Sequence, residues 1–338
     1  MSSGRASVRP RSLALLAALL AALAAMRPLA AGAAPEGSVV WYTTTEAPTV
    51  AALETRFAQL HPEVAVQTLR LSTAEITPRL ITEQHGGLYN ADIVSGDEVQ
   101  LSLLRTAGAL QPYHPSDADR FIAGSVEPNG YWTSLYQDST VIAWNVARLH
   151  DDGLRAPATT ADLARPEYRG HIGLNANALS WYLGLLQADP KNRDVVRAIG
   201  ANGPFLTTSH TGTMTQLVAG EFDVTPTVYG YLALHEKLTG QPVDFVNPAP
   251  ALLTLVPVAL VKNAPHPIAA RLFLAFLLSR EGQRIIVDAS GRSSSRTDVP
   301  VDARVFDPKR PYVVVHAPAD PAAFAAANRD LRTLLGMP

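Results

Sequence analysis

From residue 38 onward, patterns typical of strands and of helices alternate along the chain, and this alternation limits the folds open to it. Residues 39–43 form an apolar strand pattern, after which Val50, Leu53 and Phe57 recur at helical spacing. Further strand patterns lie at 64–69, 91–94, 171–174, 222–228 and 252–261, each followed by a helical pattern. Repeated βα units of this kind predict an α/β fold built on parallel or mixed sheets.

Local signals set several helix boundaries. Ser72 and Glu75 have the spacing of a capping box, and residues 159–162 resemble a second helix cap. Pro267 fits the first turn of a helix over 267–278, because the N–H that proline lacks has no partner there. Ser279 and Glu281 then predict the start of the next helix.

The first 33 residues predict an export leader. Arg5, Arg9 and Arg11 give a basic start, and an uncharged apolar run over 13–26 precedes the small-residue sequence Ala31-Gly32-Ala33. The 14-residue run is shorter than the roughly 17–25 residues of a membrane-spanning helix. We expect a signal peptide cleaved near Ala33 and a mature protein in the periplasm; the alternative is an uncleaved amphipathic anchor. The sequence has no cysteine for a lipid anchor or a disulfide.

Charge excludes one class of partner. The chain has 28 basic and 30 acidic residues, and four of the basic ones lie in the leader, which leaves a net charge of −6 on the mature chain. This balance gives no electrostatic basis for binding nucleic acid or an anionic membrane surface. We expect a monomer.

Several short motifs together resemble a known family. They are VVWYT at 39–43, Glu83 ahead of ADIV at 91–94, GALQPY at 108–113, DLARPEYRG at 162–170, HPIAA at 266–270 and FLLSREGQ at 276–283. The chain is similar in these motifs to the extracellular solute-binding proteins of ABC importers, in the type 2 periplasmic binding group that includes the ferric-ion-binding proteins.

The resemblance implies two α/β lobes joined by two crossing strands, each lobe a mixed sheet flanked by helices. We place lobe one at 36–138 plus 258–320, lobe two at 139–257, and an outer C-terminal helix at 321–338. Candidate hinges lie at 137–140 and 247–250. A solute held between the lobes favours the closed state, which the inner-membrane permease would recognise.

For the ligand, the resemblance implies a set of metal-binding positions. In the ferric binders a histidine of the first βα loop, an acidic residue after the ADIV-type strand and two adjacent tyrosines supply ligands. Carried onto this chain, these positions fall on Glu46, Asp97, Tyr229 and Tyr231, without the histidine and without the adjacency. Phenolates and carboxylates suit Fe(III), with or without a synergistic anion. The tyrosines are alternatively ordinary half-buried aromatic residues. No other cofactor is expected.

A small organic or oxo-anion, such as a phosphonate or carboxylate, is the second candidate ligand. Hydroxyl and amide side chains stand where loops open helices and could receive an anion together with helix N-termini. They are Thr43, Thr44, Thr45, Ser95, Asn177, Ser180, Thr211 and Thr213. Each is alternatively a simple helix cap. No arginine falls in these loops, and Glu46 and Asp97 would repel an anion.

Catalytic motifs find no match, so we do not expect an enzyme. His235-Glu236 lacks the second histidine of a zinc-protease helix, because residue 239 is threonine. The GRSSS segment at 291–295 fails the nucleophile-elbow pattern. A sensor that presents its solute to a receptor would have the same fold and stays an alternative to import.

Overall fold

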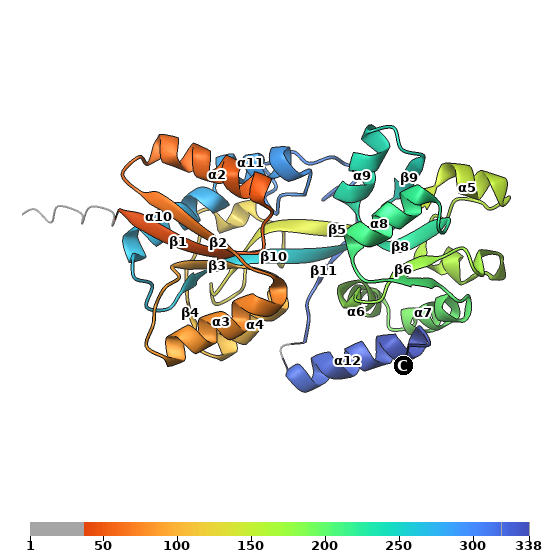
Figure 1. Cartoon of the computed structure of the whole chain (residues 1–338), viewed down its shortest axis with the longest axis horizontal. Coiled ribbons are helices and arrows are strands. Elements are labelled where there is room, and N and C mark those ends of the chain that lie inside the picture. Colours follow the sequence, from red (N-terminus) through yellow and green to blue (C-terminus); the bar gives the residue numbers. More distant parts are fainter. Residues whose placement is uncertain (1–36, 319, 338) are drawn as a thin grey trace, which may run out of the picture. The chain divides into compact units, whose positions relative to one another are not determined.

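The structure is a computed structural model that describes residues 37–318 and 320–337. The predicted leader lies outside the described residues. Strands and helices alternate as predicted (Figure 1). The strands are β1 Ser38–Thr43, β2 Ala65–Arg70, β3 Ile93–Ser95, β4 Leu110–Gln111, β5 Thr133–Asn145, β6 Gly173–Asn175, β7 Phe205–Thr207, β8 Val224–Tyr229, β9 Val243–Val246, β10 Ala251–Val261 and β11 Tyr312–Val315. The α-helices are α2 Ala47–Leu60, α3 Thr73–His85, α4 Glu98–Thr106, α5 Val146–Asp151, α6 Leu179–Ala188, α7 Asn192–Ala201, α8 His210–Ala219, α9 Gly230–Leu238, α10 Pro267–Leu278, α11 Arg280–Ser290 and α12 Pro321–Leu334.

The predicted α/β fold with a mixed sheet is confirmed. Nine strands form one sheet with the order β2-β1-β3-β10-β5-β8, to which β4 and β11 add on β10 and β9 adds on β5. Strand β1 runs parallel to β2 and β3, whereas β10 runs antiparallel to β3 and β5. Strands β6 and β7 form a separate parallel pair.

The two long strands β5 and β10 make the main sheet continuous. They pair antiparallel from Thr133 opposite Val258 to Thr140 opposite Leu252, with one register shift beside Pro257. The predicted hinge at 137–140 therefore lies inside a paired strand. The lobe boundaries themselves stay a prediction.

Separate hydrophobic clusters form on the two faces of β1, because successive side chains of a strand point to opposite sides. Trp41 packs edge-on against Phe273 with ring centroids 5.6 Å apart, in a cluster with helices α2, α10 and α11. Its neighbour Tyr42 joins Leu80 and Leu101 of α3 and α4. Figure 1 shows these two groups of helices on opposite sides of β1–β3. Burying one such aromatic side chain contributes roughly 1.5–3 kcal/mol.

Further clusters lie around β8. Tyr182 and Trp181 of α6 pack with Val224 and with Leu331 of the C-terminal helix α12. A smaller group contains Met214 and Phe222. These clusters hold α8 and α9 against the carboxyl end of β8, where Tyr229 is the last strand residue.

The predicted caps are confirmed. Ser72 and Glu75 form a capping box before α3, and Thr159 and Asp162 form another. Ser279 accepts a hydrogen bond from the Gly282 N–H at the start of α11, and the predicted helix over 267–278 is α10. Asp97 caps α4 through the Gln100 N–H at 3.1 Å.

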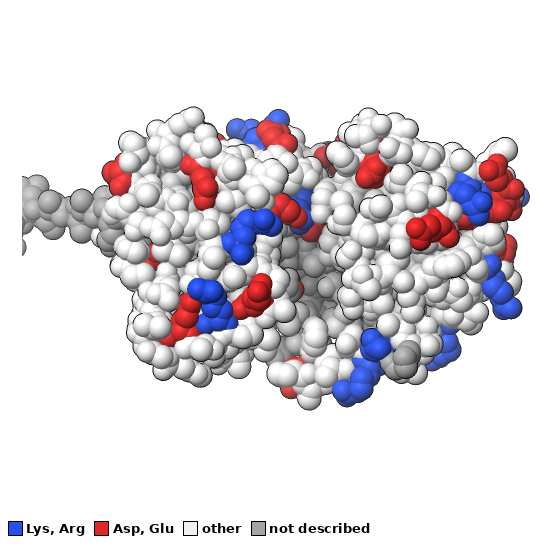
Figure 2. Space-filling model, in the orientation of Figure 1, with Lys and Arg blue, Asp and Glu red and all other residues white. Residues whose placement is uncertain are grey.

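Two surface properties bear on location and partners. Within 37–318 and 320–337, no helix is long and apolar enough to cross a membrane. On the face in Figure 2, acidic and basic side chains are interspersed. That face carries no continuous basic patch of the kind that binds phosphate backbones.

Candidate functional site

The candidate site is centred on Arg292, which lies two residues after the end of α11. Gly291 caps α11 with φ +70°, a left-handed conformation that glycine adopts without a steric penalty. The chain then turns back, and the Ser293 carbonyl accepts a hydrogen bond from the Gln137 N–H of β5 at 2.9 Å. This local fold holds the Arg292 side chain against the middle of β5, where it is 8% exposed.

The Arg292 guanidinium is bonded to residues from three other segments. Its Nη1 donates to Asp138 Oδ2 of β5 at 2.6 Å. Its Nη2 donates to Glu46 Oε1, ahead of α2, at 2.5 Å and to the Tyr231 hydroxyl of α9 at 2.9 Å. The rings of Tyr136 and Tyr231 lie 4.7 and 4.5 Å from the guanidinium carbon. The site thus combines two ion pairs with two cation–π contacts.

Burial and this arginine set the protonation states of the site. Burial acts to lower the pKa of Arg292. The pKa is nevertheless raised above its usual range by neighbouring groups, of which Asp138 has the largest effect and Tyr136, Tyr231 and Glu46 have smaller ones. Burial raises the pKa of Asp138 to about 6 despite the neighbouring guanidinium. Burial also raises the pKa of Tyr136 to about 12 and raises the pKa values of Tyr229 and Tyr231. At neutral pH the three tyrosines are therefore neutral hydroxyls beside a fixed cation.

Two buried atoms of this cluster have no hydrogen-bond partner among the described residues. They are Arg292 Nε and Asp138 Oδ1. Buried polar atoms in proteins are nearly always bonded, since an unsatisfied one costs about 1–3 kcal/mol. A guanidinium offers five N–H donors, and the hydrogen bonds of Arg292 to Asp138, Glu46 and Tyr231 use three of them. The cluster therefore retains hydrogen-bonding capacity for a bound molecule.

The four predicted metal ligands fall in one neighbourhood. The Tyr229 ring is 6.3 Å from that of Tyr231 and 4.0 Å from that of His210. Asp138, Arg292, Tyr231 and Asp97 all act electrostatically on the Tyr229 hydroxyl. One carboxylate oxygen of Asp97 accepts the capping hydrogen bond of α4, and burial raises the pKa of Asp97. Glu46 and Tyr231 both contact Arg292 directly.

The predicted hydroxyl and amide residues divide into two groups. Thr43, Thr45, Ser95 and Thr213 are fully buried and bonded within the chain; Thr43 contacts Ser95 at 2.6 Å, and Thr213 contacts Thr207 at 2.5 Å. Their bonds hold strand ends and helix starts together. The others are at least partly exposed: Thr44, Asn177, Ser180 and Thr211.

Asn177 and Ser180 line a hollow of about 160 Å³ together with Asp97 and Thr254. The Asn177 side-chain amide donates to the Thr208 carbonyl at 2.9 Å. Ser180 lies in the first turn of α6, and Asp97 is the cap of α4, so two helix starts face this hollow. Three of the residues predicted to bind ligand therefore share one recess.

Comparison with known proteins identifies the family. A sequence profile of the family described as bacterial extracellular solute-binding protein matches residues 90–315. The chain belongs to this family. The resemblance predicted from the motifs is thereby confirmed.

Solved structures of solute-binding proteins share the fold of this chain. Iron-bound HitA from Pseudomonas aeruginosa aligns with 88% of this chain and 99% of its own, at a TM-score of 0.73 and 20% identity. The substrate-binding protein of an ABC transporter from Agrobacterium tumefaciens aligns with 90% and 96%, at 0.73 and 17%. AfuA from Actinobacillus pleuropneumoniae, with exogenous fructose-6-phosphate bound, aligns with 89% and 97%, at 0.68 and 20%. At these identities the likeness concerns the type 2 periplasmic binding fold.

One curated relative matches in sequence. The probable ABC transporter periplasmic-binding protein y4fP of Sinorhizobium fredii is 30% identical over 114 residues. The match spans 33% of this chain and 31% of that relative.

Sequence reasoning missed much of the site of this solute-binding protein. The sequence at 291–295 indicates only a failed nucleophile elbow, and the lack of an arginine in the loops argues against an anionic ligand. The structure corrects this, because Arg292 reaches the loops from a distant part of the chain. Asp138 offered one signal, since a carboxylate inside a strand is unusual. His210 is a further member; its Nδ1 donates to the Thr227 carbonyl at 2.7 Å, and burial lowers its pKa.

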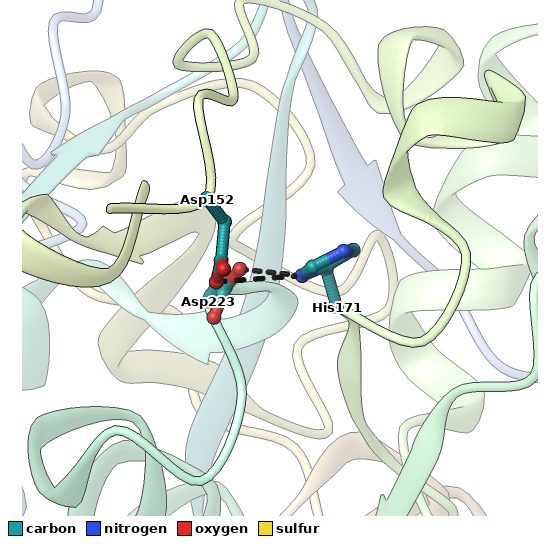
Figure 3. Close-up of side chains that lie close together, drawn as sticks. All are labelled: Asp152, His171 and Asp223. Carbon is teal, nitrogen blue, oxygen red and sulfur yellow. Dashed lines mark hydrogen bonds and ion pairs between the residues drawn. The ribbon is translucent and has the colours of Figure 1, made fainter. Parts of the chain in front are cut away.

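A second charged cluster of this solute-binding protein contains Asp152, His171 and Asp223 (Figure 3). His171 Nδ1 is 2.6 Å from Asp223 Oδ2 and 3.8 Å from Asp152 Oδ2. Its geometry alone resembles a metal site. Arg148, however, pairs with Asp223 at 3.2 Å and with Asp152 at 3.0 Å. Each carboxylate thus already has Arg148 as an ion-pair partner, and these pairs connect α5 to the start of β8.

Proposed function

We propose that this protein is the periplasmic solute-binding component of an ABC importer and delivers a small cargo to the inner-membrane permease. Its family and the name of its relative y4fP support this assignment. Noncovalent capture suffices for that role, because the permease and its ATPase carry out transport. A neighbouring gene for a permease would support import, and one for a histidine kinase would support sensing.

For the cargo, we propose a small organic or oxo-acid that binds the Arg292 guanidinium. One observation carries the proposal: a buried arginine, stacked against two tyrosine rings, retains unused N–H donors. Guanidinium groups bind carboxylates and phosphonates through paired N–H···O bonds, which are about twice as strong as neutral hydrogen bonds. The loop hydroxyls alone offered an anion no positive charge, and Arg292 supplies that charge.

The site residues come from both predicted lobes, which is consistent with a cargo being held when the lobes close. Arg292 comes from predicted lobe one and Tyr231 from predicted lobe two, and the two side chains are 2.9 Å apart. A cargo that contacts both binds the closed state better and shifts the population toward it. This difference in affinity is the signal that a permease would read.

Thermal unfolding of the ligand-free protein tests the cargo proposal. The protein is refolded from denaturant to remove carried-over solute and is then heated with phosphonates, carboxylates or phosphate. A cargo at a hundred times its Kd adds about 2.7 kcal/mol and raises the Tm by several degrees. We expect such a shift with at least one acid and its loss in R292K. A shift that survives in R292K would contradict the anchor role of Arg292.

Ferric iron is the second candidate, favoured by the oxygen ligands gathered around Tyr229. The hydroxyls of Tyr229 and Tyr231 and the carboxylates of Glu46, Asp97 and Asp138 are the hard donors that Fe(III) prefers. Iron would have to displace the guanidinium from Glu46 and Tyr231 and remove phenolic protons whose pKa values are raised. Arg292 would then hold the synergistic anion.

Absorption spectroscopy separates the two candidates. Tyrosinate coordinated to Fe(III) gives a visible band, whereas binding of an organic acid gives none. Development of that band on titration with ferric citrate, and its loss in Y231F, would favour iron. A protein that stays colourless and is stabilised by an acid supports the Arg292 anchor.

A further inference from the structure

Resting on the proposed function, we infer that Glu46 is an exchangeable counter-ion of Arg292 and that the cargo carries an amino group beside its acid group. The two carboxylates on the guanidinium differ sharply in exposure. The Asp138 side chain is 3% exposed, and that of Glu46 is 48% exposed. One partner is therefore fixed, and the other can leave.

The position of Glu46 in the chain supports its release. Glu46 precedes α2 in an extended conformation, and its side chain makes no capping hydrogen bond there. Asp138, in contrast, lies in β5, where its backbone pairs with Thr254 of β10. Rotation of the Glu46 side chain disturbs no secondary structure. It exposes Nη2, the nitrogen that also donates to Tyr231.

An incoming acid group takes the place that the Glu46 carboxylate occupies. Its oxygens accept from Nη2 and, as the side chain adjusts, from the unpartnered Nε. Carboxylate and phosphonate oxygens resemble the Glu46 oxygens in charge and hydrogen bonding. Glu46 thus acts as an internal stand-in for the acid group of the cargo.

The charge balance then defines the rest of the cargo. In the part of the chain that the structure describes, Arg292 is the one cation in an ion pair with Glu46 or Asp138, and Asp97 adds a further carboxylate to the surroundings of Tyr229. After a plain anion entered, the freed Glu46 would face it with like charge. An ammonium group on the cargo removes this repulsion by pairing with Glu46, and the neighbouring tyrosine rings also suit a cation.

Matched ligand pairs test this inference. Isothermal titration compares β-alanine with propionate, and 2-aminoethylphosphonate with ethylphosphonate, so that the members of each pair differ in the amino group. We expect the wild-type protein to bind the amino member of at least one pair at least tenfold tighter. E46Q should lose this preference and bind the plain acid more tightly than the wild type does.

E281Q is the matched control. Glu281 of α11 pairs with Arg56 of α2 at 2.5 Å and is 47% exposed, so it repeats the ion-pair distance and the exposure of Glu46. This variant should keep the preference of the wild type. Circular dichroism of both variants checks that they fold equally.

The outcomes separate this inference from the proposed function. Binding of plain acids without an amino preference, abolished in R292K, would overturn the inference and leave the anchor role of Arg292 standing. An amino preference that persists in E46Q also overturns it. Binding of none of the four probes, or of Fe(III) alone, would overturn both.

Discussion

Arg292 and Arg296 come from the same short segment and are both buried, yet their guanidinium groups differ in hydrogen bonding. Arg296 donates through Nε and Nη2 to the two oxygens of Asp298 at 2.8 and 2.9 Å. Its Nη1 donates to Asp117 at 2.5 Å and to the Leu278 carbonyl at 3.1 Å. Every nitrogen of Arg296 has a partner, whereas Arg292 Nε has none among the described residues.

The difference shows how a structural arginine can be told from a binding one. Burial and ion pairing are common to both, so neither property separates them. The two arginines differ instead in how many of their N–H groups are hydrogen-bonded and in which residues surround them. Arg296 ties Asp117 to the end of α10, while Arg292 is surrounded by tyrosines and by an exposed carboxylate.

The largest expected effect is a loss of stability on removal of the Arg296 charge. R296M breaks both ion pairs and should lower the free energy of unfolding by about 3 kcal/mol. Urea denaturation followed by circular dichroism measures the change. A loss below 1 kcal/mol would remove the structural role that the comparison assigns to Arg296.

R292K should give the opposite pattern. Lysine keeps the charge near Asp138 but lacks the planar pair of N–H donors, so affinity for the acid should fall about a hundredfold, or about 2.7 kcal/mol. Isothermal titration measures it, and R296K serves as the control with unchanged Kd. Equal losses of affinity in the two variants would erase the distinction between the arginines.

Y231F sharpens the nature of the cargo. It removes one hydrogen bond to Arg292 and keeps the ring, so affinity for an organic acid should fall only about fivefold, or about 1 kcal/mol. If the hydroxyl instead coordinates iron as phenolate, the loss of affinity should reach a hundredfold or more. The size of the loss in a titration with each ligand decides between these cases.

The dependence of stability on pH should have opposite signs at the partners of the two arginines. Burial raises the pKa of Asp138 to about 6, so the folded state binds more protons there and its stability falls as pH rises from about 4 to 6. The hydrogen bond from Arg296 lowers the pKa of Asp298, so its contribution is lost as pH falls below about 4.

D138N should therefore flatten the decline of stability above pH 4, and D298N should reduce the loss below it. Urea unfolding at a series of pH values measures both slopes. Changes in slope of the same sign in the two variants, each measured against the wild type in its own pH range, would contradict the assigned protonation states.

Much of the fold was predictable because its signals are local. Pro267 and Ser279 set the bounds of α10, and the strand pattern at 39–43 identified β1 within one residue. The first half of β5 was missed because Gln137 and Asp138 break its apolar pattern, and pairing with β10 makes it a strand. Strand β11 likewise depends on a distant partner.

The site was less predictable for the same reason. Motif positions located Glu46, Asp97, Tyr229 and Tyr231 near one another, since each follows a strand or opens a helix. The arginine between them could not be placed, because its contacts join residues 46, 138, 231 and 292 across the whole chain. Long-range packing determines such contacts, and a local sequence pattern does not predict them.

The left-handed turn at Gly291 makes the position of the Arg292 side chain depend on a single backbone position. Any other residue there strains the turn that aims its neighbour toward β5, although a Cβ would meet only ordinary packing distance to Tyr231. Substitution of Gly291 should therefore disturb the contacts of Arg292 without changing any side chain of its cluster.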